Sequence, residues 1–305
     1  MLSTQQINEF ERNGCLNGGR ILSDAELAEL TAELDRVIDT GPRGFGPSDP
    51  KPVLFRDLTG SVDGTKDTYG SGDGKTPVWQ IVNMWECSPA FEKLLYHPKV
   101  VTGISQLTGM SDLMIWHDQV QYKPAQAGGA TSWHQDAPLW PTILPMTPVS
   151  AWIPFDDADL DNGCMWMIPG SHKWGNQMEF LRAKQNLKDL QEFGKANEGF
   201  NVPADSPVKE AKAIPWPVKK GEVSFHHSLT WHGSPTNKSP RPRRAIAIHY
   251  MTGAAYYAGK RGHPMEQFIN LPDGAPMIEA GEHFPIVCRN SKPVKPVKLL
   301  SLSAH

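Results

Sequence analysis

The sequence predicts a mainly β protein with flanking helices, and its β part has the strand spacing of an antiparallel sandwich or barrel. Helical patterns occur in the first 110 residues, and from residue 112 onward the sequence pattern changes to that of short strands. Short segments rich in β-branched and aromatic residues follow, bounded by Gly, Pro, Asn or Asp, as strands are. Glycine and proline, at 27 residues each, are also too frequent for a helix bundle. The strand-like segments are LMIWHDQVQY, VSAWIPFDD, CMWMIPG, GEVSFHH and RRAIAIHYM.

Three helices are expected ahead of the β region. The first covers residues 3–13 and the third covers about 89–108, where apolar residues recur at helical spacing. The second helix begins at a capping box, in which Ser23 and Glu26 satisfy each other's backbone amides. Gly41, which is followed by proline, ends this second helix.

The chain is expected to form a single domain, because it contains no internal repeat and no low-complexity tract. A stretch rich in Gly, Pro, Asp and Ser at 41–77 is expected to be a surface loop that acts as a lid, with simple disorder as the alternative. The expected parts of the domain over 1–305 are 1–110 with the N-terminal helices and lid loop, 111–255 with the β core and a helical insertion at about 176–215, and 256–305 as a C-terminal extension.

Composition and charge exclude several classes of partner. The formal net charge is -3, so no basic excess indicates a nucleic-acid partner. No apolar run reaches the length of about 18 residues that a membrane-spanning helix needs. The four cysteines form no Cys-x-x-Cys pair and predict reduced thiols in a cytoplasmic protein.

The stretch SWHQDAPLW places two potential metal ligands, His134 and Asp136, one residue apart. If this stretch is a strand, both side chains project from one face, because alternate residues share a face. Two histidines and one carboxylate on one octahedral face form the site of non-haem Fe(II) oxygenases, which leaves positions open for a 2-oxo acid. Such a site needs a second histidine, and an arginine to hold the far carboxylate of 2-oxoglutarate. An ordinary polar pair on a strand is the alternative.

The stretch TWHGSPTNKSPRPRRAIAIHYM supplies both missing residues. His232 precedes a turn, and alternation in the strand that follows puts Arg243 on one face beside two alanines. Small side chains next to a charge leave room for a co-substrate. Arg244 is expected to face the other way, and Arg241 is expected to lie in the turn. A solvated basic turn is the alternative interpretation of the run RPRR.

Three motifs that occur in this order resemble the phytanoyl-CoA dioxygenase family: WHQD at 133–136, NGCMWMIPGSHKWG at 162–175 and HGSPTNKSPRPRRA at 232–245. The similarity covers most of the chain, including the N-terminal helices. It implies a double-stranded β-helix, which is a jelly-roll or cupin-like fold. It also implies an oxidoreductase, a dioxygenase that uses Fe(II), 2-oxoglutarate and O2.

The resemblance implies roles for individual residues. His134, Asp136 and His232 correspond to the iron ligands of the family. Arg243 corresponds to the arginine that pairs with the distal carboxylate of 2-oxoglutarate. The other positions that match co-substrate contacts are Ser234, Trp152 and Gln119. A plain core tryptophan and a satisfied buried amide are the alternatives for the last two.

Three further histidines lie near these motifs without matching a ligand position. His226 and His227 precede the last ligand and are expected to be structural or to support the metal ligands. His172 is expected to stabilise the PGSH turn. The retained Asp136 favours hydroxylation over halogenation, because the related iron halogenases lack this carboxylate.

The expected function is an Fe(II)- and 2-oxoglutarate-dependent dioxygenase that hydroxylates or otherwise oxidises a small-molecule metabolite. Trp133 and Trp140 are the expected substrate contacts, together with the segments 41–77 and 176–215. Two alternatives stay open. One is a cupin-like metal-dependent isomerase or hydrolase, which would not need Arg243, and the other is a non-catalytic jelly-roll protein that binds a ligand. Neither the substrate nor the oligomeric state follows from the sequence.

Overall fold

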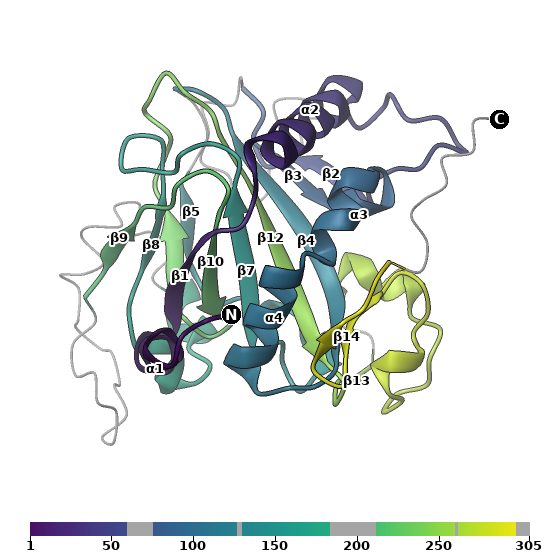
Figure 1. Cartoon of the computed structure of the whole chain (residues 1–305). Helices are drawn as coiled ribbons and strands as arrows, with labels where there is room; N and C mark the ends of the chain where they lie inside the picture. The colour runs from purple at the N-terminus through teal and green to yellow at the C-terminus, as the bar shows by residue number, and fades with distance from the viewer. Residues whose placement is uncertain (60–75, 127–129, 184–211, 260–261, 297–305) are drawn as a thin grey trace.

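Two facing antiparallel sheets form the centre of the molecule, in a computed structural model that describes residues 1–59, 76–126, 130–183, 212–259 and 262–296. Helices from the N-terminal third of the chain cover the outer face of the larger sheet (Figure 1). This arrangement confirms the prediction of a mainly β protein with flanking helices, although the described strands do not close into a barrel.

The larger sheet contains nine of the described strands. Its main path is β1 (Cys15–Arg20), β10 (Glu222–His227), β7 (Val149–Pro154), β12 (Arg243–Thr252), β4 (Leu113–Lys123), β14 (Ile286–Arg289) and β15 (Lys292–Pro293). Strand β3 (Trp79–Val82) also pairs with β4, and β2 (Leu54–Asp57) pairs with β3. Strands from both ends of the chain therefore flank the central β7, β12 and β4.

The smaller sheet faces the larger one and has four described strands. Their order is β5 (Thr131–His134), β11 (His232–Ser234), β8 (Met165–Met167) and β9 (Ile214–Trp216). A separate two-stranded sheet pairs β13 (Tyr256–Tyr257) with β6 (Ile143–Leu144). Short 3-10 helices connect these elements: η1 (Met84–Glu86), η2 (Ala137–Leu139), η3 (Ser171–Trp174), η4 (Pro264–Phe268) and η5 (Met277–Glu279).

The N-terminal helices begin where the sequence predicts. The described helices are α1 (Thr4–Asn13), α2 (Asp24–Thr40), α3 (Pro89–Leu95), α4 (Pro98–Thr108) and α5 (Met178–Ala183). At the start of α2, the Ser23 hydroxyl accepts the amide of Glu26, and the Glu26 carboxylate accepts the amide of Ser23. The chain then leaves this helix at Gly41.

The single helix expected over 89–108 is wrong, because the structure has two helices there. Tyr96 and His97 separate α3 from α4, and Pro98 is the first residue of α4. Proline has no amide hydrogen to donate to the preceding turn, and it disfavours helical backbone at the residue before it. Pro98 can therefore start a helix but cannot continue one.

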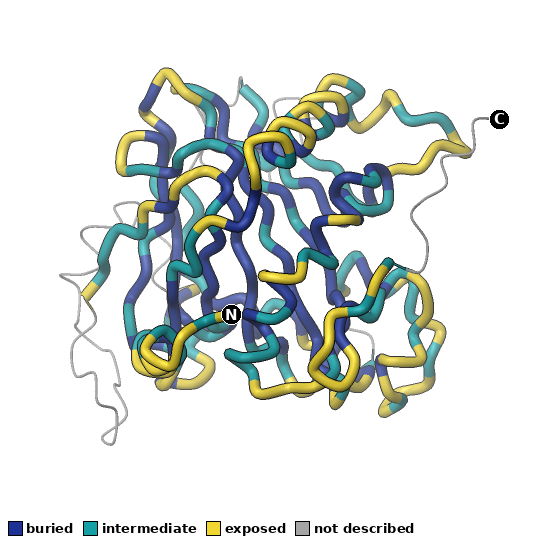
Figure 2. Tube along the Cα trace, in the orientation of Figure 1, coloured by how far each residue is buried: buried dark blue, intermediate teal, exposed yellow. Residues whose placement is uncertain are grey.

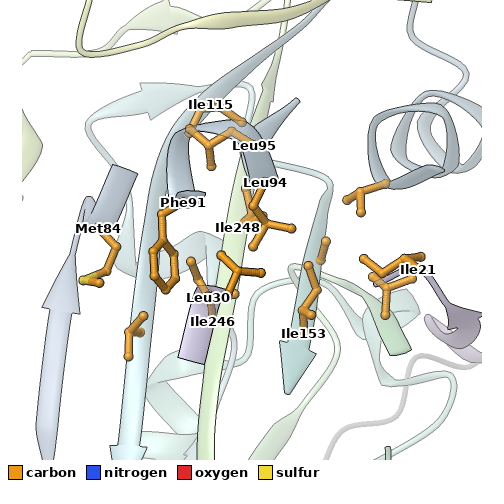
Figure 3. Close-up of a cluster of buried hydrophobic side chains, with 14 of the residues drawn as sticks. Ile21, Leu30, Met84, Phe91, Leu94, Leu95, Ile115, Ile153, Ile246 and Ile248 are labelled. Atoms are coloured by element: carbon orange, nitrogen blue, oxygen red, sulfur yellow. The ribbon is translucent and has the colours of Figure 1, made fainter. Parts of the chain in front are cut away.

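The main hydrophobic core lies between the helices and the outer face of the larger sheet. Leu30 of α2 and Phe91 and Leu94 of α3 belong to one buried cluster with Ile246 and Ile248 of β12 (Figure 3). The sheet strands beneath the helices are buried along most of their length (Figure 2). Burial of each large apolar side chain contributes about 1.5–3 kcal/mol, so this layer fixes the sheet in place.

Strand β12 divides the two faces of the larger sheet in the alternating pattern that the sequence predicts. Ile246 and Ile248 belong to the core under the helices. Arg243, Ala247 and His249 occupy the opposite face, which looks toward the smaller sheet. The inner face is thus free to carry polar groups, because the outer face supplies the apolar contacts.

The strands extend beyond the core range expected at 111–255. Strand β1 lies between the first two helices, β2 falls inside the loop expected at 41–77, and β14 and β15 come from the C-terminal part. Residues 60–75 and 184–211 of the two expected lids lie outside the described residues. Within the described ranges, no helix is long and apolar enough to cross a bilayer.

Candidate active site

Strand pairing brings His134 and His232 together across the smaller sheet. They are directly opposed residues of β5 and β11, and their ring centroids are 4.1 Å apart. Oδ1 of Asp136 lies 3.5 Å from Nε2 of each histidine. Potential ligand atoms of these three residues all lie within 4.8 Å of one another. They form the only such group of His, Cys, Asp or Glu in the part of the chain that the structure describes.

A turn, rather than strand alternation, aims Asp136 at the two histidines. The stretch is a strand end, because β5 stops at His134 and Asp136 has helical backbone angles (φ -72°, ψ -55°). The buried Gln135 anchors this turn, since its side-chain amide donates to the carbonyl oxygens of Gly175 and Leu229.

Both histidines are held in the orientation that a metal ligand needs. Nδ1 of His134 donates to the carbonyl oxygen of Ser132 at 2.8 Å, and Nδ1 of His232 donates to that of Thr230 at 2.9 Å. A carbonyl oxygen only accepts hydrogen bonds, so each ring carries its proton on Nδ1 when neutral. Nε2 of each ring is then left with a free lone pair directed at the other ligands, as in metal-binding histidines.

The charges at this site also suit a cation. Burial raises the pKa of the Asp136 carboxyl, but the imidazoles of His232, His134 and His226 together hold that pKa well below its ordinary value. Burial and the neighbouring His134 lower the pKa of His232 to about 3, so its Nε2 stays unprotonated near neutral pH. An ionised carboxylate beside a neutral imidazole is the donor set that a divalent ion prefers.

A cavity of about 410 Å³ opens beside the three residues, between the two sheets. Its lining includes all three, together with Ser234, Trp152 and Gln119, which the sequence also singled out. Trp152 is buried on the inner face of β7, and Gln119 accepts a hydrogen bond of 2.7 Å from the Gln80 amide. The structure therefore brings the expected co-substrate contacts to one cavity.

Arg243 is fully buried next to this cavity, and its guanidinium is only partly paired. Nη1 donates to the carbonyl oxygen of Gly163 at 3.3 Å, whereas Nε and Nη2 have no hydrogen-bond partner among the described residues. The guanidinium carbon lies 5.7 Å from the centre of the Trp152 ring. Burial lowers the pKa of Arg243 to about 10, so it remains charged near neutral pH. Two unpaired, buried N–H groups on one charged fork fit a carboxylate.

A second buried cation, Lys123, was missed by the sequence reasoning. It lies opposite Arg243 in the pairing of β4 with β12. Its Nζ donates to the hydroxyl of Ser234 at 2.7 Å and to the carbonyl oxygen of Pro235 at 2.8 Å. Burial, assisted by Arg243, lowers the pKa of Lys123 well below its ordinary value. Lys123 directly follows the predicted strand segment LMIWHDQVQY, and alternation continued by one residue places it on the same face as Gln119.

The two tryptophans expected to touch substrate lie in different places. Trp140 lines the cavity, and its ring centroid is 4.4 Å from that of His249. Trp133 instead belongs to a separate buried cluster with Trp231 and Trp174. Because it precedes His134 on β5, it points to the opposite face of that strand. The structure therefore does not support a substrate contact for Trp133.

Neutral imidazoles gather at the Trp140 end of the cavity, another feature that sequence reasoning missed. The rings of His117 and His249 are 4.6 Å apart, and those of His117 and His263 are 5.1 Å apart. Burial lowers the pKa of both His249 and His263 to about 4. The Ser150 hydroxyl and Nδ1 of His249 form a hydrogen bond of 2.7 Å. This end of the cavity offers uncharged polar groups between aromatic rings.

The remaining polar residues take the positions that the sequence suggested. His226 contacts Asp136, with 2.9 Å between Nε2 and Oδ2. His227 faces away from the cavity and its ring lies 5.1 Å from that of His172, at the PGSH turn. Arg244 points outward and pairs with Asp156 and Asp35, and Arg241 is exposed in the turn and pairs with Asp159.

Fold and site together define a class of protein. A sheet pair with a buried centre of two histidines and one carboxylate is the arrangement of the non-haem iron oxygenases. The sequence model of the phytanoyl-CoA dioxygenase family matches residues 10–245, so the chain belongs to this family. Membership confirms the predicted resemblance and the prediction of an oxidoreductase.

Curated relatives support this membership. The bovine peroxisomal phytanoyl-CoA dioxygenase is 27% identical over 273 residues, which cover 87% of this chain and 73% of the relative. An ectoine dioxygenase from Bordetella bronchiseptica is 26% identical over 261 residues, covering 82% of this chain and 75% of the relative.

Solved structures confirm the jelly-roll fold. The epimerase SnoN in complex with Fe3+, alpha ketoglutarate and nogalamycin RO superposes with a TM-score of 0.63 at 19% identity, covering 92% of this chain and 97% of that one. EctD from S. alaskensis with 2-oxoglutarate and 5-hydroxyectoine has a TM-score of 0.60 at 19% identity, covering 84% and 78%. A carbocyclase, SnoK, also has this fold, with a TM-score of 0.63 at 22% identity and coverage of 93% and 96%.

Proposed function

We propose that the protein binds Fe(II) through His134, Asp136 and His232, and that it couples 2-oxoglutarate to the hydroxylation or other oxidation of a small-molecule metabolite. One observation carries the proposal. The cavity that holds the three potential ligands also reaches Ser234 and Trp152. Beside Trp152, Arg243 has two buried nitrogens without a partner among the described residues. In the proposed function, the metal would bind in this cavity, and Arg243 would hold the co-substrate from behind its wall residue Trp152.

The three ligand residues are suited to hold the ion without rearrangement. The backbone carbonyls behind His134 and His232 fix both rings with Nε2 facing Asp136. These ligands occupy one side of the centre and leave the cavity side open to 2-oxoglutarate. When bound, the ion and 2-oxoglutarate supply the oxidising chemistry, in which 2-oxoglutarate and O2 yield succinate and carbon dioxide.

The far carboxylate of 2-oxoglutarate would meet a charged, partly preassembled site. Arg243 can donate from Nε and Nη2, which is the bidentate geometry that arginine forms with carboxylates. The Ser234 hydroxyl is held by Lys123 on the same side. Trp152 and Gln119 line the same cavity as the three potential ligands. In this role the guanidinium of Arg243 would gain a hydrogen-bonded carboxylate, which its partners among the described residues do not include.

The substrate would bind at the other end of the cavity. Trp140, His249 and His263 line this end and present aromatic and uncharged polar surface close to Asp136. A cavity of about 410 Å³ suits a small molecule rather than a polymer. The cytoplasmic location suggested by the composition remains a prediction.

Two other functions predicted as alternatives lack a comparable observation. A metal-dependent isomerase or hydrolase on this fold would have no use for the guanidinium of Arg243, whose Nε and Nη2 lack a partner among the described residues. A simple binding protein would have no use for the oriented histidines. Neither alternative explains why the cavity that holds the histidines is also lined by Trp152, which packs against Arg243. Both predict that 2-oxoglutarate is not consumed.

The proposal is tested by the release of succinate from 2-oxoglutarate. The purified protein is incubated with Fe(II), ascorbate and a panel of metabolites, and compared with His134→Ala and with a control, His172→Ala, which lies outside the cavity. We expect turnover in the wild type and the control and its loss in His134→Ala. Equal succinate release by the wild type and His134→Ala would refute the iron site, and a wild type that ignores 2-oxoglutarate would favour the alternatives.

A further inference from the structure

The carboxylate of Asp136 uses its two oxygens for different partners. Oδ1 lies 3.5 Å from Nε2 of both His134 and His232, as a shared metal ligand would require. Oδ2 lies 2.9 Å from Nε2 of His226, which comes from a strand of the other sheet. This hydrogen bond therefore links β10 of the larger sheet to the turn that follows β5 of the smaller sheet.

His226 is rigidly placed to make this contact. Its side chain is 2% exposed, and that of Asp136 is 8% exposed. His226 lies near the end of β10, where it pairs with Cys15 of β1 on one side and with Ser150 of β7 on the other. Strands on both sides therefore fix the backbone of His226. Asp136 instead follows the end of its own strand, in the turn that Gln135 anchors.

The hydrogen bonding of the ring indicates where its proton lies. Within the described chain, Nδ1 of His226 is buried and has no hydrogen-bond partner. A proton on Nδ1 would be a buried donor without an acceptor, which costs about 1–3 kcal/mol. The neutral ring therefore carries its proton on Nε2 and donates it to Asp136 Oδ2. This tautomer is the reverse of that in His134 and His232, whose Nδ1 atoms are the donors.

We infer that His226 is a positioning residue of the metal centre, which holds Asp136 so that only Oδ1 is free to bind the ion. This inference rests on the proposed metal site but adds a residue to it. With Oδ2 occupied by a protein donor, the carboxylate binds through one oxygen and takes one coordination position instead of two. The remaining positions then stay open to the 2-oxo acid and O2, as the proposed reaction needs.

Two variants separate this role from a general effect on folding. His226→Phe keeps a flat ring in the strand but removes the donor, and His226→Gln keeps an N–H donor of similar reach. The control is His227→Asn, which changes the adjacent residue of β10 on the face away from the cavity and retains an acceptor for the amide of Leu229. Thermal unfolding identifies any variant that does not fold.

Binding of Co(II) to the metal-free protein is the readout, measured by titration and by the visible absorption spectrum of the bound ion. Loss of a hydrogen bond that orients a ligand typically weakens metal binding about 10- to 100-fold. We expect this loss in His226→Phe, together with a changed spectrum as the freed Oδ2 also reaches the ion. His226→Gln should restore the affinity and spectrum most of the way, and His227→Asn should match the wild type.

Each contrary result has a distinct meaning. Wild-type affinity and spectrum in His226→Phe would overturn the inference and leave the metal site intact. Equal losses in His226→Phe and His226→Gln would also overturn it, because they would indicate that the imidazole itself is a ligand. Absence of Co(II) binding by the wild type would overturn the metal site and the inference together.

Discussion

The ammonium of Lys123 donates a hydrogen bond of 2.7 Å to the hydroxyl of Ser234, and both side chains are buried. Lys123 lies directly across the strand pair from Arg243. In the described part of the chain, the hydrogen bonds of both side chains run to carbonyl and hydroxyl oxygens and none runs to a carboxylate. Positive charge buried at these two side chains is costly unless an anion joins it.

Replacement of Arg243 by glutamine should weaken 2-oxoglutarate binding far more than it affects folding. Removal of one partner from a buried, hydrogen-bonded charge pair costs about 2–5 kcal/mol, so the KM for 2-oxoglutarate should rise about 30-fold or more. Arg244→Gln is the matched control, because it removes the next side chain, which pairs with Asp156 and Asp35 outside the cavity. If both variants raise this KM equally, Arg243 is not the anchor.

Lys123 should act on 2-oxoglutarate through Ser234, and a double-mutant cycle tests this coupling. Lys123→Met and Ser234→Ala should each weaken 2-oxoglutarate binding, by about 10-fold for a hydrogen bond to a charged group. Combined, they should weaken it by clearly less than the product of the two factors, because Lys123 holds the Ser234 hydroxyl. The measurement is the ligand-induced rise in melting temperature. Fully independent effects would contradict the coupling.

The protein should lose stability in acid through its buried neutral histidines. Burial and the nearby His172 lower the pKa of His227 to about 3, and burial with Lys173 lowers that of His172 to about 4. Below pH 6.5 these histidines bind protons in the unfolded chain but stay neutral in the folded chain. The free energy of unfolding therefore falls by about 1.4 kcal/mol per pH unit for each such residue. This contribution is fully present above pH 6.5 and is lost toward pH 3–4.

Urea titrations between pH 7 and pH 4 measure this slope. His227→Asn removes one titrating ring and keeps the acceptor for the amide of Leu229. The variant should therefore show a shallower decline in acid than the wild type, whatever its stability at pH 7. An unchanged slope would show that His227 is not among the groups responsible.

Gly103 of α4 should resist replacement by alanine, despite the better helix propensity of alanine. A Cβ at this position would lie 2.7 Å from Cζ of the buried Phe225 on β10. Overpacking costs about 1–3 kcal/mol, whereas the gain in helix propensity is at most about 1 kcal/mol. Gly103→Ala should thus lower the free energy of unfolding, and the loss should shrink in a Phe225→Leu background. An equal loss in both backgrounds would exclude the ring contact as the cause.

Much of the site follows from local pattern in the sequence. The alternation of β12 predicts that Arg243 and Arg244 point to opposite faces, because one face of that strand must be apolar. The same rule places Trp133 and His134 on opposite faces of β5, so the position of Trp133 was predictable from the position of its neighbour. Trp140 lines the cavity because of the turn after β5, which no strand pattern describes.

Other features depend on contacts that a local pattern does not contain. Strand β1 has the sequence CLNGGR, which shows no alternation, and its strand character comes from its pairing with β10. Lys123 ends a strand-like run, where a lysine is usually solvated, and only the pairing of β4 with β12 reveals its burial. His226 and His227 differ in role although they are adjacent, because the strand turns one toward Asp136 and the other away.

The pairing of β1 with β10 also constrains how the molecule assembles. Asn17 and Glu222 form a hydrogen bond of 3.0 Å across a sequence separation of 205 residues. During synthesis, β1 therefore cannot pair until β10, about 200 residues later, has left the ribosome. Closing so large a loop is entropically costly and slow, and an unpaired strand edge invites association with other chains. A nascent chain that stops before residue 222 is thus an expected client for chaperones.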